Sequence, residues 1–112
     1  MHELGLCEGV LETVCRRAAG RPVSRVRVRA GIRHAVDPLS MEQAFQLISQ
    51  GTEAAGATVD LVTVPARLTC RTCGATAETT DLLAICGRCG GADVELHGGD
   101  ELVLESIEYA RE

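Results

Sequence analysis

The spacing of apolar residues changes from helical to strand-like within the first part of the chain. Over residues 4–19 apolar side chains recur at alternating three- and four-residue steps, which predicts an amphipathic helix. Gly20 and Pro22 are expected to end this helix. Over residues 23–33 valine, alanine and isoleucine alternate strictly with arginine and other residues, which predicts a half-buried strand with one charged face.

A second helix and a second strand follow. Asp37 and Pro38 form a helix start, with Asp37 as the N-cap and Pro38 at the first helical position. The apolar spacing then predicts a helix with Gly51 at its C-cap. Residues 57–64 predict a strand, which Pro65 closes.

The last apolar segment, residues 101–109, predicts a further strand. Its apolar residues fall on both parities, so either a bulge shifts the register or both faces are partly covered. A lone terminal strand needs a sheet to join. The sheet formed within residues 23–64 is the natural host.

Four cysteines form two pairs, Cys70-x2-Cys73 and Cys86-x2-Cys89, with twelve residues between the pairs. This spacing is typical of two tight turns that present four thiolates to one tetrahedral zinc ion. Glycines follow each pair, where a residue without Cβ can turn sharply and point backbone N–H groups at the sulfurs. The alternatives are two disulfides or a redox C-x-x-C. No stretch resembling a signal peptide indicates the oxidising compartment that disulfides need.

These elements predict an α+β fold with two helices packed on a small three-stranded mixed sheet and an inserted zinc-ribbon module. We expect residues 1–66 plus 96–112 to form an α/β domain that binds a second metal. Residues 67–95 are expected to form the zinc-binding ribbon domain.

Composition narrows the range of functions. All basic residues are arginine, so a Schiff-base lysine and a P-loop lysine are both excluded. The net charge of −5 argues against a nucleic-acid binder. No apolar stretch approaches the length of a membrane span, and we expect a cytoplasmic protein without membrane association.

The N-terminus offers a second candidate metal site. In Met1-His2 the α-amine, the ionised amide nitrogen of His2 and its imidazole can close fused chelate rings around one metal ion. Nitrogen-rich planar ligation suits Ni(II) or Cu(II) and not Zn(II). Glu3 and Asp37 are the available hard donors for a further ligand.

The order of these motifs resembles the HypA/HybF family of nickel metallochaperones of [NiFe]-hydrogenase maturation. The resemblance rests on Met-His-Glu-Leu at the start, Leu-x-Cys shortly after, Asp-Pro at the second helix, two C-x-x-C-G motifs, and Gly-Gly-Asp-Glu-Leu before the last strand. It covers the whole chain in order. Two features depart from the family pattern: residues 75–85 lack the aromatics and histidines of some members, and no family role transfers to His97.

The resemblance implies an exchangeable nickel ion bound by His2 and the Met1 amine, with Glu3 and Asp37 as matching acidic positions. It also implies a structural zinc ion on Cys70, Cys73, Cys86 and Cys89. The implied partners are a nickel-binding GTPase of hydrogenase maturation and the hydrogenase large subunit.

The preferred hypothesis is therefore a non-enzymatic nickel carrier. One alternative is a zinc-ribbon adaptor in a nucleic-acid or transcription complex, which few nearby arginines and no aromatic residue support. Another is a thiol oxidoreductase, which needs a C-x-x-C at a helix N-terminus. His34 and His97 are expected to be exposed turn residues, and Cys7 and Cys15 to be buried in the first helix.

Overall fold

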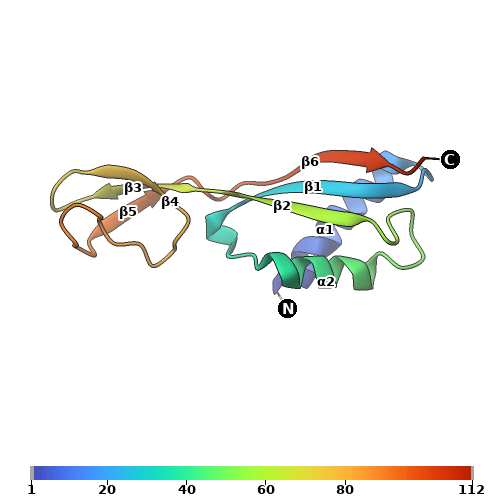
Figure 1. The fold of residues 1–112 in the computed structure, drawn as a ribbon, viewed down its shortest axis with the longest axis horizontal. Coiled ribbons are helices and arrows are strands. Elements are labelled where there is room, and N and C mark those ends of the chain that lie inside the picture. Colours follow the sequence, from blue (N-terminus) through green and yellow to red (C-terminus); the bar gives the residue numbers. More distant parts are fainter. Residues whose placement is uncertain (1, 112) are drawn as a thin grey trace. The chain divides into compact units, whose positions relative to one another are not determined.

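The computed structural model describes residues 2–111 and contains two helices, one short 3-10 helix and six strands (Figure 1). By their contacts these residues form two compact units. The first unit holds the residues up to Arg29, Val36–Val62 and those from Val103 onward. The second holds Ala30–Ala35 and Thr63–Leu102. In chain order the elements are α1 (His2–Ala18), β1 (Val23–Gly31), η1 (Ile32–His34), α2 (Pro38–Ile48), β2 (Thr58–Val64), β3 (Ala66–Cys70), β4 (Thr76–Thr79), β5 (Val94–His97) and β6 (Leu102–Tyr109).

The first sheet has the strand order β2-β1-β6. Figure 1 shows β2 running in the same direction as β1 and β6 running in the opposite direction, so the sheet is mixed. The C-terminal strand therefore joins the sheet of the N-terminal half, as predicted. Everything between β2 and β6, including the second sheet, is inserted between two strands of one sheet.

The parity change predicted for β6 lies between Leu104 and Ile107, which both pack against the core. β1 contains a matching three-residue step between its buried residues Val23 and Val26. Val103, directly before Leu104, points to the opposite face of the sheet and is 47% exposed. A local change of face in both strands, and not coverage of both faces, thus accounts for the apolar pattern.

The core of the first unit lies between the helices and one face of this sheet. Its two largest side chains, Met41 and Phe45, are fully buried on α2, and Cys7 and Val14 face them from α1. The Cys7 thiol donates a hydrogen bond of 3.4 Å to the Met41 carbonyl oxygen. The apolar spacing of residues 4–19 thus does mark the buried face of α1, to which the structure adds Val10.

The start of α2 follows the predicted capping pattern. The Asp37 carboxylate accepts a hydrogen bond of 3.0 Å from the Ser40 N–H, and Pro38 occupies the first turn. The end of the helix differs from the expectation. Ser49 is the C-cap, and Gly51 lies two residues further on in a turn with φ of 79°. The Ser49 N–H donates the last helical hydrogen bond, to the Phe45 carbonyl oxygen at 3.0 Å.

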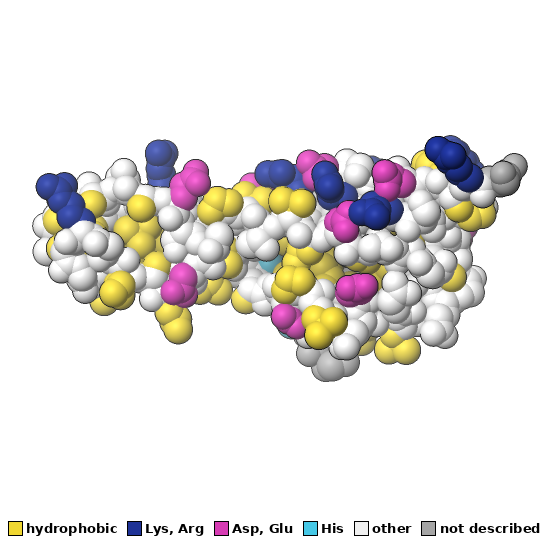
Figure 2. All heavy atoms as spheres, viewed as in Figure 1, with side chains coloured by type: hydrophobic (Ala, Val, Ile, Leu, Met, Phe, Trp, Pro, Cys, Tyr) yellow, Lys and Arg dark blue, Asp and Glu magenta, His cyan; other side chains and the backbone are white. Residues whose placement is uncertain are grey.

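The outer face of the first sheet carries charged side chains that form ion pairs with one another. Arg25 of β1 forms ion pairs with Asp60 of β2 at 2.7 Å and with Glu108 of β6 at 3.1 Å. Arg29 contacts Glu105 at 3.7 Å. Figure 2 shows basic and acidic side chains side by side over this region. The arginine row is accordingly a solvated strand face with its own counter-charges.

The second sheet is antiparallel, with the order β4-β3-β5. The central strand β3 pairs with both neighbours, and Arg67 lies opposite Glu78 of β4 and His97 of β5. Leu68 and Cys70 of β3 are buried on the opposite side from Arg67.

A close backbone contact joins residues 31–33 to the segment before β6. The Gly31 N–H donates to the Glu101 carbonyl oxygen at 2.7 Å, and the Arg33 N–H donates to that of Gly99 at 2.8 Å. A Cβ atom at Gly31 would lie 2.0 Å from the carbonyl carbon and oxygen of Gly99. Only glycine therefore fits at position 31 without movement of the backbone.

Gly31→Ala should lower the free energy of unfolding by about 1–3 kcal/mol. The added methyl group would overlap backbone atoms of Gly99 and Asp100, so the backbone would have to shift. Thermal or urea unfolding measures the change. Gly9→Ala on α1 is the matched control, since no atom lies within 4 Å of the position that a Cβ would take there. That control should leave stability unchanged or raise it by about 0.5–1 kcal/mol. Equal unfolding midpoints for Gly31→Ala and the parent protein would contradict this account.

Candidate metal centre

The first cysteine pair sits in a tight turn at the end of β3. The Gly74 N–H donates to the Cys70 carbonyl oxygen at 2.9 Å, and the Cys70 N–H donates to that of Ala75 at 2.9 Å. Gly74 has a φ of 77°, in the left-handed region that glycine adopts without a steric penalty. The turn therefore reverses the chain directly after Cys73, and β4 begins at Thr76.

The second pair repeats this geometry although no strand leads into it. The Gly90 N–H donates to the Cys86 carbonyl oxygen at 2.8 Å, and the Cys86 N–H donates to that of Gly91 at 2.9 Å. The Gly91 N–H also points at the Cys89 sulfur, at 3.4 Å. The glycines thus act as the sequence predicted, by turning the chain and directing N–H groups at sulfur.

The two turns bring all four cysteine sulfurs together. Every Sγ atom lies within 4.8 Å of the other three. The Cys70–Cys89 and Cys73–Cys86 sulfur pairs are each 3.6 Å apart. Neighbouring sulfurs around a tetrahedral zinc ion with Zn–S bonds of about 2.3 Å are about 3.8 Å apart. The four cysteines therefore fit a tetrathiolate zinc site, with Cys70 and Cys86 buried and Cys73 and Cys89 exposed.

Backbone donors favour the ionised form of the first cysteine of each pair. The Cys89 N–H, at 3.5 Å from the Cys86 sulfur, and the Arg88 N–H lower the pKa of Cys86 to about 6. The Cys73 N–H likewise lowers the pKa of Cys70. A thiolate is the form that binds zinc, so these N–H groups prepare two of the four ligands.

The same geometry bears on the two alternatives for the cysteines. All six cysteines are free thiols in the structure. Each C-x-x-C lies in a turn and not at the first turn of a helix, which is where a redox motif would gain a reactive thiolate. The arrangement supports a metal site over a thiol oxidoreductase.

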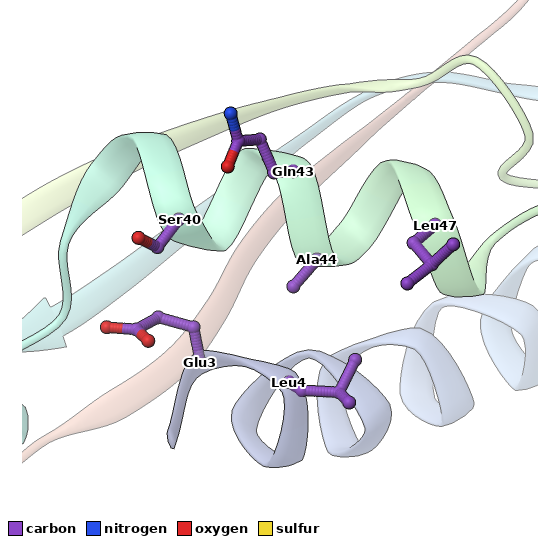
Figure 3. Close-up of a pocket in the computed structure, with 6 residues that line it drawn as sticks. All are labelled: Glu3, Leu4, Ser40, Gln43, Ala44 and Leu47. Carbon is purple, nitrogen blue, oxygen red and sulfur yellow. The ribbon is translucent and has the colours of Figure 1, made fainter. Parts of the chain in front are cut away.

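The candidate nickel residues lie at the starts of α1 and α2. His2 is the exposed first residue of α1, and Met1 lies outside the described residues. The structure brings Glu3 and Asp37 together, because the Glu3 carboxylate accepts a hydrogen bond of 3.2 Å from the Asp37 N–H. Figure 3 shows the Glu3 side chain directed toward α2, near Ser40. The Glu3 side chain, which follows His2 in the chain, therefore contacts the backbone at the start of α2.

Both acidic side chains are held in the ionised form. The Asp37 N–H lowers the pKa of Glu3, with further contributions from its own backbone and the nearby His2. The Ser40 hydroxyl, 2.6 Å away, and the Ser40 N–H lower the pKa of Asp37. Each carboxylate is thus available as a hard anionic donor at neutral pH, and each already has a structural role.

The other two histidines lie outside the four-cysteine cluster and do not lie in exposed turns as predicted. His34 is half-buried at the end of η1, and His97 is exposed at the end of β5. His34 Nε2 lies 2.8 Å from the Asp100 carbonyl oxygen. His97 Nε2 lies 3.7 Å from a Glu95 carboxylate oxygen at the end of β5. Within residues 2–111 the four cysteines form the group whose ligand atoms converge closely enough to hold a metal.

Sequence reasoning did not foresee the bond between Glu3 and Asp37. The two residues are separated by α1 and β1, and neither helix spacing nor a capping pattern indicates that their side chain and backbone meet. It also did not assign a partner to His34.

Fold and site together define a small α+β metal-binding protein with a four-cysteine centre, and comparison with known proteins places it in a family. Residues 1–109 match the family model described as "Hydrogenase/urease nickel incorporation, metallochaperone, hypA". The chain belongs to this HypA family.

Individual members of this family are similar to the chain over nearly its full length. The chain is 33% identical over 111 residues to hydrogenase maturation factor HypA of Rhodobacter capsulatus, covering 96% of this chain and 98% of that protein. It is 36% identical over 111 residues to the HypA of Dehalococcoides mccartyi strain CBDB1, covering 96% and 93%. The solution structure of the Ni metallochaperone HypA from Helicobacter pylori matches with a TM-score of 0.57, 25% identity and full coverage of both chains. None of the helices within residues 2–111 is long and apolar enough to cross a membrane.

Cys73→Ala should abolish binding of one zinc ion per chain, because three thiolates leave the tetrahedron incomplete. Residues 67–95 should then lose their structure, while α1, α2 and their sheet remain folded on their own core. Elemental analysis and amide NMR spectra measure the two effects. Cys15→Ala is the matched control and should keep zinc, since Cys15 lies on α1 outside the cluster. Purified parent protein without zinc, or with its four cysteines in disulfides, would contradict the assignment.

Proposed function

We propose that this protein is a nickel metallochaperone that binds Ni(II) at its N-terminus and delivers it during maturation of [NiFe]-hydrogenase, with a structural zinc ion in the four-cysteine site. The observation that carries the proposal is the whole-chain match to the nickel-incorporation family, together with a histidine in position 2 followed by Glu3, whose carboxylate contacts the Asp37 backbone. The protein is a carrier and not an enzyme.

The nickel ligands we propose are the Met1 amine, the His2 imidazole and the amide nitrogen between them, with Glu3 and Asp37 as acidic candidates for a further position. The nitrogen donors are adjacent in sequence, so their chelate rings close without ordering any loop. His2 is exposed at the beginning of α1. Ligands at the end of a chain can leave one at a time, and cargo transfer requires such stepwise release.

Glu3 and Asp37 would contribute in different ways. The Asp37 carboxylate already holds two bonds to Ser40, so ligation by Asp37 would compete with the α2 cap. The Glu3 carboxylate uses one oxygen on the Asp37 N–H and keeps acceptor capacity on the other. We therefore favour Glu3 over Asp37 as the additional nickel ligand.

The zinc ion would act as a structural element. Four cysteine ligands leave no open coordination position for a substrate, which is the pattern of structural and not catalytic zinc. We propose that the unit built around it recognises the partners of nickel delivery. By family resemblance these partners are a nickel-binding GTPase and the hydrogenase large subunit, and the site of action is the cytoplasm.

The zinc-ribbon adaptor is the less supported alternative. Arg71, beside the first cysteine pair, is paired with Asp93 at 3.0 Å and with Glu95 at 3.9 Å. Its charge is therefore offset locally and is poorly placed to bind phosphates.

His2→Ala should abolish binding of Ni(II) while zinc content and fold stay unchanged, because the imidazole closes the second chelate ring. Isothermal titration of protein with a native N-terminus measures this. Extension of the N-terminus by one residue should weaken Ni(II) binding as much as His2→Ala does, since it removes the primary amine from the chelate. Undiminished affinity in the extended protein would rule out this mode of ligation.

Conservative substitutions can distinguish the contributions of Glu3 and Asp37 to nickel binding. Glu3→Gln should weaken Ni(II) binding by more than Asp37→Asn, because the asparagine side chain would still cap α2 and the Asp37 carboxylate is already engaged. Binding by the parent should also weaken as the pH is lowered, because protons compete with Ni(II) for the nitrogen ligands. A larger loss of Ni(II) affinity for Asp37→Asn than for Glu3→Gln would contradict the choice of Glu3 as the additional ligand and would favour Asp37.

A further inference from the structure

Helix α2 is apolar on two faces, and the core covers one of them. Met41 and Phe45 point into the core and are fully buried. Leu39 and Leu47, on a different face, are 61% and 64% exposed, with Gln43 halfway between them. Residues at four-residue spacing lie on one side of a helix, so these three form a continuous outer stripe. A helix with apolar residues on both sides usually has both covered.

A groove runs between this outer stripe and α1. Leu4 of α1 and Ala44 and Leu47 of α2 form its apolar walls, and Glu3 and Ser40 lie at one end. Figure 3 shows Leu4, Ala44 and Leu47 directed into the space between the two helices. Its volume is about 260 Å³. This is below the roughly 300–1,000 Å³ of small-molecule pockets and suits a single apolar side chain.

Acidic side chains outnumber arginines on the two helices that form the groove. The first arginine of α1 is Arg16, near its C-terminal end, and α2 contains no arginine. The acidic side chains of the two helices are Glu3, Glu8, Glu12 and Glu42. Glu8 follows Leu4 by one helical turn and so lies on the same side of α1. An apolar groove in an acidic surface complements an apolar side chain with basic neighbours.

We propose that this groove docks an apolar side chain, flanked by lysine or arginine, of the protein that exchanges nickel with this chain. The identity of that partner rests on the proposed function. Glu3 belongs to both the groove and the candidate nickel site, so docking brings the partner to the start of α1, where His2 lies. The groove thereby supplies the specificity that a short N-terminal chelate lacks.

Other occupants fit the charges less well. A second copy of the chain would bring acidic residues against acidic residues, and its net charge is −5. An anionic membrane surface would be repelled in the same way. A protein segment with basic residues is the occupant that the charges favour.

The test measures binding of the purified nickel-binding GTPase and of the purified hydrogenase large subunit to variants of this chain. Leu47→Asp should weaken the binding of at least one of the two by about tenfold or more, because it places a charge in the apolar wall. Ala44→Phe should do the same by filling the groove, without adding a charge. Circular dichroism checks that both variants keep their helices.

Val103→Asp is the matched control, since Val103 lies on β6 of the first unit, is 47% exposed and does not line the groove. It should leave the affinity of that same partner unchanged. Higher salt should weaken binding of the parent, as expected for opposite charges at the contact.

Three results would overturn the proposal. The first is that neither protein binds, or that binding survives both groove variants. The second is that Val103→Asp costs as much affinity as Leu47→Asp. The third is a parent dimer in sedimentation experiments that Leu47→Asp dissociates, which would make a second copy the occupant. Ni(II) titration of the same variants keeps the two proposals apart, because nickel binding should survive Leu47→Asp and Ala44→Phe.

Discussion

The convergence of four cysteine sulfurs is the constraint on which the second unit depends. Few apolar side chains of that unit are buried, namely Ala30, Ala66, Leu68, Cys70 and Cys86, and two of these are cysteines of the cluster. So small a core cannot offset the conformational entropy of ordering three strands and two turns. A structural zinc ion contributes roughly 10–16 kcal/mol of apparent folding free energy in small modules. We expect three features of this unit to depend on the sulfurs staying together. They are the backbone hydrogen bonds to sulfur, the turns at the glycines and the pairing of β3 with its neighbours.

The first unit is held by a different kind of interaction. Its core consists mainly of valine and alanine with Cys7, Met41 and Phe45, and it relies on close packing between α1, α2 and the sheet. Two polar contacts fix the helices against each other near their starts. The Cys7 thiol bonds to the Met41 carbonyl oxygen, and the Glu3 carboxylate bonds to the Asp37 N–H. The residues proposed to hold nickel are therefore placed by the packing of the helices and not by a preformed cage.

Much of this architecture could be predicted from the sequence because its signals are local. The alternation from Val26 to Ala30, the Asp-Pro helix start and the spaced cysteine pairs each specify structure within a few residues. The strand predicted over residues 23–33 ends at Gly31, and Ile32 and Arg33 belong to η1. Contacts between distant segments left no such signal. Neither the bond from Glu3 to Asp37 nor the close approach of Gly31 to Gly99 can be read from spacing. The groove beside Leu47 was also not foreseen, since exposure of a leucine depends on which face of α2 the core takes.

The position of the second sheet within the chain has a consequence for how the last strand finds its place. β6 can pair with β1 only after the chain from Pro65 to Glu101 has closed a long loop. The pairing of Arg67 with His97 holds the two ends of that loop together and leaves only short connections on either side. Shortening a loop about fivefold reduces the entropic cost of closing it by about 1.5 kcal/mol. The inserted sheet thus reduces the conformational entropy that is lost when β6 pairs with β1.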